Sequence, residues 1–317
     1  MPELRPYRPG DEQGICDLFS TCHGRPLPLD VWRWRYAPQN GTAPVIEVAV
    51  EAGRVVAHLG TLPVTLQRGE EALSAGLWVD LMVHPDSRNL SLFLDMAEAN
   101  HRHCAEAGLR LVFAFPNDRS YPVLKRMLNW NTIEDIDALE APLSELKPIP
   151  AETNIRKVSD FTSEYDDLWR RLRPDGAFVG TKTSAWLSWR YRQRPAGRYE
   201  AWCARNENER LSGWLVAKFF DAPQGRIGDI LDFCAEPDSF DALWSTALTH
   251  FKTSGVQTIS SWALRGSPLF QRFVGWGLAP RGPRTHFAGR WTSPNELAPF
   301  PARGEDWRVS KGDSDIF

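Results

Sequence analysis

The chain has 317 residues, of which 42% are hydrophobic and 24% charged, and its formal net charge is −3. This composition is typical of a globular protein, and the length predicts two domains. Without a block of basic residues, nucleic acid is an unfavourable partner, because phosphate contacts dominate such binding. No apolar run is long enough to span a membrane, and the N-terminal residues do not form a signal peptide.

The cysteines indicate a reducing compartment. There are five, an odd number, and no two of them form a Cys-x-x-Cys pair. This pattern predicts buried, reduced thiols in a cytoplasmic protein rather than a disulfide framework. Cys104 lies close to His101 and His103 along the chain, but no second group of ligands completes a metal site, so we expect no metal cofactor.

Helix and strand signals alternate along the first half. The patterns predict a strand at 2–9, a helix from 10, a second helix at 29–36 and a hairpin of strands at 46–50 and 54–64. They then predict a strand at 73–83, a long helix at 92–107, a strand at 109–115 and a short helix at 120–128. Glu51-Ala52-Gly53 supplies the hairpin turn, and Gly108 ends the long helix. Three prolines within 139–150 predict a linker there.

The second half repeats this plan. Landmarks recur in the same order and at nearly constant separation: Trp34-Arg35-Tyr36 as Trp189-Arg190-Tyr191, 54–57 as 210–213, 80–87 as 232–239, Gly108 as Gly255, and Asn129-Trp130 as Gly275-Trp276. One such match could arise by chance, but several in register predict a duplication. We therefore expect an N-terminal domain over 1–145 and a C-terminal domain over 146–317.

The junction between the strand at 73–83 and the helix that follows suits an anion. The first N–H groups of a helix have no partner within the helix, and Arg88 lies beside them, so a pyrophosphate would fit there. The second copy is shorter at this point and reads Pro237-Asp238-Ser239-Phe240-Asp241, where acidic residues would repel phosphate. A phosphorylated cofactor is therefore expected in the first half. The second half is expected to be structural or to help form the acceptor pocket.

Two stretches carry a family resemblance. Val83-His84-Pro85-Asp86-Ser87-Arg88 and Phe115-Pro116-Asn117, with the order of the elements, resemble the GNAT superfamily of acyl-CoA N-acyltransferases. Because both halves share the outline, the chain looks most like tandem GNAT proteins. The resemblance implies an α/β fold of two tandem GNAT-like domains, each with a mixed, mostly antiparallel central sheet flanked by helices. Residues 311–315 also resemble the tail of such proteins.

The resemblance implies acetyl-CoA or another acyl-CoA as cosubstrate. Backbone groups of the strand end would pair with pantetheine, the loop amides would hold the pyrophosphate, and an asparagine after the next strand would contact the cofactor. These positions are Met82, Val83, Arg88, Asn89, Leu90, Ser91, Leu92, Phe93 and Asn117. The family's first and last loop glycines are replaced by Ser91 and Phe93, which predicts weakened but not abolished CoA binding. Phe93 is expected to point into the core.

Acyl transfer to an amine needs a base for the ammonium proton and often an acid for the departing thiolate. Asp80 is the candidate base, since strand alternation places it on one face with Trp78 and Met82. The alternative is a structural ion pair, which its equivalent in the second copy favours. Tyr121 is the candidate acid or else a packed helix residue, while the family's usual tyrosine position falls near Leu124.

Four other groups have two interpretations each. Glu47 faces the acceptor amine or pairs with an arginine, and His84 assists proton transfer or is a solvated loop histidine. Arg88 binds phosphate or forms a surface salt bridge. Trp34-Arg35-Tyr36 lines an acceptor cleft or packs in the core, and its recurrence in the second half favours the core.

The sequence therefore predicts a cytoplasmic acyltransferase. It would move an acetyl or short acyl group from acyl-CoA to a primary amine of a small metabolite or amino sugar, by direct attack in a ternary complex. Two alternatives stay open. One is a non-catalytic ligand-binding or scaffold protein that kept the fold, and the other is an acyltransferase whose donor is an acyl-carrier protein.

Overall fold

The computed structural model describes residues 2–38, 41–149, 154–293, 296 and 298–314, and the chain divides into two compact units. Unit 1 comprises 1–66, 72–133 and 286–302, and unit 2 comprises 67–71, 134–285 and 303–317. A late segment of the chain therefore returns to unit 1 before the last residues join unit 2. Pro150 of the expected linker and Asp315 of the expected tail lie outside the described residues.

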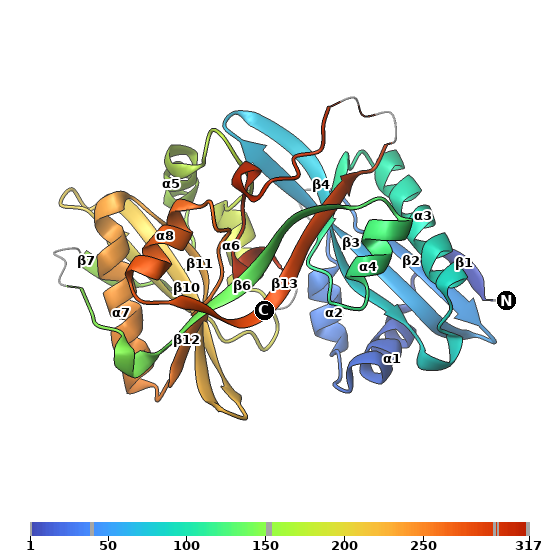
Figure 1. The fold of residues 1–317 in the computed structure, drawn as a ribbon, viewed down its shortest axis with the longest axis horizontal. Helices are drawn as coiled ribbons and strands as arrows, with labels where there is room; N and C mark the ends of the chain where they lie inside the picture. The colour runs from blue at the N-terminus through green and yellow to red at the C-terminus, as the bar shows by residue number, and fades with distance from the viewer. Residues whose placement is uncertain (1, 39–40, 150–153, 294–295, 297, 315–317) are drawn as a thin grey trace. The chain divides into compact units, whose positions relative to one another are not determined.

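Unit 1 is built on a mixed sheet (Figure 1). Its strands follow the order β1 (Glu3–Pro6), β2 (Val45–Glu51), β3 (Arg54–Arg68), β4 (Glu71–Val83), β5 (Leu111–Ala114) and β13 (Ala279–Trp291). The pairs β1–β2, β2–β3 and β5–β13 are antiparallel, whereas β4–β5 is parallel. The helices are α1 (Glu12–His23), α2 (Leu29–Arg35), α3 (Leu90–Glu106) and α4 (Tyr121–Met127).

The helices of unit 1 cover both faces of its sheet. On β3, Ala57 and Leu59 pack in one cluster with residues of α3 and α4. The intervening His58 lies on the opposite face, where the ring of Tyr36 meets it edge-on at 5.7 Å, just beyond α2. Alternation along the strand thus separates an α3/α4 face from an α1/α2 face.

Unit 2 has the corresponding sheet. Its order is β6 (Asn131–Pro142), β12 (Thr258–Ser261), β11 (Gly225–Ala235), β10 (Leu211–Ala222), β9 (Glu200–Arg205) and β7 (Asn154–Lys157), and β8 (Phe178–Gly180) pairs with β14 (Trp307–Arg308). Its helices are α5 (Glu164–Leu172), α6 (Ser184–Tyr191), α7 (Phe240–Thr253) and α8 (Pro268–Gly275). Within the described residues, short 3₁₀ turns lie at 85–87, 143–145, 237–239, 304–306 and 311–313.

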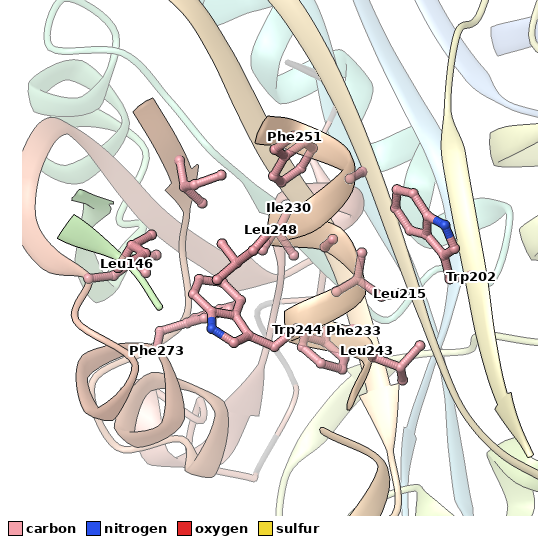
Figure 2. Packing of buried hydrophobic residues seen from close by; sticks show 14 of the residues in the cluster. Leu146, Trp202, Leu215, Ile230, Phe233, Leu243, Trp244, Leu248, Phe251 and Phe273 are labelled. Carbon is pink, nitrogen blue, oxygen red and sulfur yellow. The ribbon is translucent and has the colours of Figure 1, made fainter. Parts of the chain in front are cut away.

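The larger core of unit 2 lies between its sheet and helices α7 and α8. Figure 2 shows Trp244 and Phe251 of α7 with Phe273 of α8, facing Leu215 and Ile230 of the sheet. Burying an aromatic side chain of this size removes roughly 150–250 Å² from water, or about 4–6 kcal/mol before the entropy cost. This cluster fixes α7 on the sheet, as α3 is fixed in unit 1.

The two units confirm the predicted duplication. Each has two helices on one face, a hairpin, a long strand, a 3₁₀ turn, a long helix, a short parallel strand and a short helix, in that order. The sequence did not predict β6, and the expectation of a linker over 139–150 is wrong for residues 139–142. Leu139 and Ala141 are buried in the unit 2 core, because this stretch pairs with β12 as a strand.

The remaining sequence expectations concern helices and thiols. No helix of the described chain is long and apolar enough to cross a membrane. All five cysteines are free thiols, and Cys16, Cys104 and Cys203 are buried. The Cys104 thiol donates to Asn100, and the His101 ring stacks on Trp78, so this part of α3 has packing roles.

Candidate active site

The parallel ladder between β4 and β5 is short. Its rungs join Ala75, Gly76 and Leu77 to Leu111, Val112 and Phe113. Strand β4 nevertheless continues to Val83, so its last six residues run on beyond the last rung with β5. Strands β4 and β5 therefore separate before the α3 junction, and the backbone groups of β4 that would face β5 are left for a different partner.

Met82 and Val83, the positions expected to pair with pantetheine, lie beyond the last rung of this ladder. Met82 is buried, whereas Val83 is partly exposed. The carbonyl of Val83 already accepts the Cys22 thiol at 3.5 Å and Nε of Arg88 at 3.3 Å. An extended ligand in this position would thus find backbone partners chiefly at Met82.

A 3₁₀ turn, Pro85–Ser87, joins β4 to α3. His84 precedes it, and its ring is buried, with Nδ1 accepting the Asp86 N–H at 3.2 Å and Arg54 against the other ring nitrogen. The expectation of a solvated loop histidine is therefore wrong, because the ring caps the turn. In the described chain no residue between His84 and Phe93 has a positive φ, so the missing glycines impose no backbone strain here.

Asn89 caps helix α3. Its side-chain oxygen accepts the Leu92 N–H at 2.7 Å, and its carbonyl accepts the Phe93 N–H at 3.4 Å. Two of the six loop amides thus already have partners. The amides of Leu90 and Ser91 come first in the helix and precede its internal bonding, so they are the donors best placed for an anion. Phe93 packs against the unit 1 core, as expected.

Arg88 lies beside this helix terminus and is exposed. Within the described chain no carboxylate lies within 4.0 Å of its guanidinium, so the alternative of a surface salt bridge is not found. A guanidinium with open donors next to a helix N-terminus is a good phosphate-binding arrangement.

Asp80 breaks the alternation that the sequence predicts. Its φ is +50°, a left-handed conformation inside a strand, and this shifts the side chains that follow it. Trp78 packs on the α3/α4 face, whereas the Asp80 carboxylate meets Arg35 and Tyr36 on the other face. The prediction that Trp78 and Asp80 share one face is therefore wrong.

The Asp80 carboxylate is buried and fully partnered. Nη1 of Arg35 lies 2.6 Å from both of its oxygens, and the Tyr36 hydroxyl donates at 2.8 Å. Burial favours the neutral acid, but the charge of Arg35 and the hydrogen bonds from Arg35 and Tyr36 outweigh it, so the pKa of Asp80 is lowered. An ionised carboxylate with both oxygens engaged holds its neighbours well and leaves little room to take a proton.

His58 is a site residue that the sequence reading missed. Its side chain is fully buried, and its Nδ1–H donates to the Asp80 carbonyl at 2.8 Å. Nε2 has no hydrogen-bond partner in the described chain. Burial lowers the pKa of His58 despite the nearby Asp80, so the ring is neutral and Nε2 carries a free lone pair. A lone histidine between Ala57 and Leu59 in an apolar strand was the available signal.

Tyr121 opens helix α4 and meets a residue from the far end of the sequence. Its ring stacks on His286 of β13, with centroids 3.9 Å apart, and its hydroxyl lies 2.5 Å from Oγ1 of Thr132. His286 Nε2 lies 3.0 Å from the Asp118 carboxylate. The candidate acid is thus held by a ring contributed from the second repeat, while Leu124 is buried in the core.

Two further candidates have structural partners. The Asn117 side-chain oxygen accepts the Arg119 and Ser120 N–H groups at 3.0 Å, so it shapes the turn before α4. Glu47 is buried and contacts Nδ1 of His103 at 2.6 Å. Burial raises the pKa of Glu47 even though His103 opposes the shift. The sequence reading offered an arginine as the partner of Glu47, but its partner in the structure is His103 of α3.

Comparisons with known proteins agree with this geometry. Residues 3–132 match the model of the acetyltransferase (GNAT) domain. Comparison with curated proteins gave no match. Among solved structures, a GCN5-related N-acetyltransferase from Anabaena variabilis has a TM-score of 0.73 at 11% identity, over 92% of this chain and 73% of that one.

Two other structures are similar over nearly the whole chain. A tandem GNAT protein from the clavulanic acid biosynthesis pathway has a TM-score of 0.64 at 14% identity, covering 93% of this chain and all of that one. Saccharomyces cerevisiae N-myristoyltransferase with bound myristoyl-CoA has a TM-score of 0.64 at 10% identity, covering 92% and 82%. Residues 3–132 therefore match the acetyltransferase (GNAT) domain, and the chain has the fold of tandem GNAT proteins over most of its length.

Proposed function

We propose that this protein is an N-acyltransferase that moves an acetyl or other short acyl group from acyl-CoA to the primary amine of a small metabolite or amino sugar. The observation that carries the proposal is the end of the β4–β5 ladder at Leu77 and Phe113, just before a helix terminus beside Arg88. The end of β4, whose backbone is not paired with β5, suits the amide-rich pantetheine arm, and the helix terminus suits a diphosphate. The acceptor class follows from the superfamily.

Acyl-CoA would lie along the end of β4. In this proposal Met82 supplies backbone partners for pantetheine, with Val83 beside it, and Arg88 with the amides of residues 89–91 holds the diphosphate. The N–H groups of Leu92 and Phe93 would not bind the diphosphate, because Asn89 already accepts them, so these two residues would only shape the loop. Asn117 would reach the cofactor from the turn before α4.

The reaction would proceed by direct attack within a ternary complex. The ammonium group of the acceptor loses one proton to a base, and its nitrogen attacks the thioester carbonyl. The C–S bond breaks, the thiolate takes a proton from Tyr121, and the second proton of the nitrogen restores the tyrosine through solvent. Asp80 and His58 are the two candidate bases. The bonds of Asp80 to Arg35 and Tyr36 favour a holding role for it, and the free lone pair of His58 Nε2 favours the histidine.

Isothermal titration calorimetry with acetyl-CoA tests the cosubstrate site. Arg88→Glu should raise Kd at least about tenfold, because it replaces a phosphate partner with a repelling charge. Arg126→Glu, at an exposed position of α4, is the matched control and should leave Kd unchanged. No heat with the wild-type protein at millimolar acetyl-CoA would refute the enzyme, and equal affinities for both variants would refute the Arg88 site.

One observation favours a carrier-protein donor as the second candidate. Because Asn89 occupies two loop amides, fewer donors are left for a diphosphate, and the phosphopantetheine of an acyl-carrier protein has only one phosphate. Comparing turnover with acetyl-CoA and with acetylated carrier protein, on the same amine panel, separates the two donors. Binding without any release of the thiol would instead support a ligand-binding or scaffold protein.

A further inference from the structure

Unit 2 repeats the short parallel ladder of unit 1. Between β11 and β12 the rungs end at Asp229 and Ser260, and β11 runs on to Ala235. Asp229 precedes Asp232 by the same three positions that separate Leu77 from Asp80, so the last rungs are equivalent. In unit 1 that rung is a buried pair of apolar residues, whereas in unit 2 it is polar.

Lys311 joins the two strands at this last rung. Its Nζ contacts Oδ1 of Asp229 on β11 and lies 2.7 Å from Oγ of Ser260 on β12. The lysine is only 3% exposed. A buried ammonium group needs both a counter-charge and hydrogen-bond acceptors, and the two strands supply them. The polar rung of unit 2 is thus complementary to this lysine.

The residues on both sides of Lys311 bind further along β11. The Ser310 hydroxyl donates to Oδ1 of Asp232 at 2.7 Å, and Asp313 lies 2.6 Å from Nζ of Lys182. Lys182 in turn contacts Asp232 at 2.9 Å, and Tyr191 donates to the same carboxylate at 2.7 Å. Lys182 thus bridges the buried carboxylates of Asp232 and Asp313, while Lys311 pairs with Asp229.

The backbone of the segment is equally well held. Arg190 donates to the carbonyls of Gly312 and Ser314, at 3.2 and 3.1 Å. A Cβ atom at Gly312 would come within 2.2 Å of the Tyr191 hydroxyl and 2.4 Å of the Asp232 carboxylate. The chain approaches β11 so closely that only glycine fits there.

We propose that Ser310–Ser314, here named the clasp, is a built-in ligand of unit 2. The clasp occupies the strand position that unit 1 keeps for the pantetheine arm, so the protein binds one acyl-CoA per chain. The comparison with pantetheine rests on the proposed function of unit 1. Removing one member of a buried charge network leaves an unpaired charge, which makes the clasp a fixed part of unit 2 rather than a mobile cover.

Hydrogen exchange of the full chain tests the clasp without any assay of activity. The amides of Ser310, Asp313 and Ser314 have protein acceptors, so the clasp should exchange as slowly as β11. Lys311→Met should raise exchange at least about tenfold in the clasp and in residues 229–235, while peptides of β4 stay unchanged. Lys252→Met, at an exposed position of α7, is the matched control and should change neither.

Should Lys311→Met not fold, Ser310→Ala removes only the hydroxyl that contacts Asp232 and Asp313 and should still raise clasp exchange severalfold. Wild-type clasp amides that exchange at the rate of an unstructured peptide would overturn the proposal. So would a Lys311→Met protein whose clasp stays as protected as that of wild type.

Adding saturating acetyl-CoA separates the clasp from the proposed function. If both hold, exchange falls in residues 78–93 and is unchanged in the clasp and in 229–235, with one ligand per chain by calorimetry. Increased clasp exchange, or two ligands per chain, would overturn the clasp as a permanent occupant. Slow clasp exchange that depends on Lys311, with no acetyl-CoA effect anywhere, would uphold the built-in ligand and refute the acyl-CoA site of unit 1.

Discussion

Nη1 of Arg35 lies 2.6 Å from both carboxylate oxygens of Asp80 in the interior of unit 1. Removing one partner of such a pair leaves a buried charge uncompensated, which typically costs about 3–5 kcal/mol. Arg35→Met should therefore lower the free energy of unfolding by about that amount in urea titrations at pH 7. Arg33→Met, at an exposed position of the same helix, should change it by less than about 0.5 kcal/mol. Equal effects would mean that the pair adds nothing beyond helix packing.

His101 predicts a loss of stability in mild acid. Burial, with a smaller effect of Arg290, lowers the pKa of His101 to about 3. The unfolded chain takes up this proton as the pH falls below about 6.5, whereas the folded chain does not until about 3. The stabilising contribution is thus present above pH 6.5 and is lost between these values, by on the order of 5 kcal/mol.

His101→Phe keeps a ring against Trp78 and removes the titrating group. Urea titrations at several pH values should show a flatter pH dependence for the variant than for wild type between about 6.5 and 3. Parallel curves for the two proteins over that interval would exclude His101 as the source.

The stacked pair of Tyr121 and His286 predicts that variants of these residues change kcat more than the KM for acyl-CoA. If Tyr121 protonates the thiolate, Tyr121→Phe should lower kcat by about a hundredfold, within the range of general acid catalysis. His286→Phe keeps the stacking surface and should retain most of kcat, whereas His286→Ala should lower kcat with little change in the KM for acyl-CoA. A Tyr121→Phe enzyme with wild-type kcat at every pH would remove the tyrosine from the mechanism.

The two candidate bases can be distinguished by their variants. His58→Gln should lower kcat by at least about a hundredfold if Nε2 takes the proton of the amine. Asp80→Asn should act mainly through stability, because it disturbs Arg35 and Tyr36. Both variants should be assayed at a temperature where circular dichroism shows them folded. A folded Asp80→Asn protein that loses kcat, with an active His58→Gln protein, would assign the base to Asp80.

Local signals explain why much of the fold could be predicted from the sequence. Gly53 and Gly108 adopt positive φ at a hairpin turn and at a helix end, conformations that glycine favours, so the element boundaries fell near the expected residues. The internal repeat was also informative, since its matched landmarks Tyr36 with Asp80 and Tyr191 with Asp232 make the same buried hydrogen bond in the two units.

Non-local pairing explains the rest. The last residues of β6, 139–142, fall in the proline-containing stretch that was predicted as a linker, and only their pairing with β12 reveals them as a strand. The left-handed backbone at Asp80 could not be predicted from alternation, because a positive φ within a strand interrupts the two-residue period. The site predicted from the sequence was incomplete for the same reason. His286 is remote from Tyr121 in sequence, as Lys311 is from Asp229, and each pair meets only in the folded chain.

The return of residues 286–302 to unit 1 has a consequence for biogenesis. During translation the first sheet lacks its β13 border until residues 279–291 have emerged, so until then the edge of β5 stays open to a wrong partner. Cutting the gene between the repeats would leave that edge exposed in the N-terminal fragment. We expect such a fragment to self-associate, and a co-expressed C-terminal fragment to rescue it.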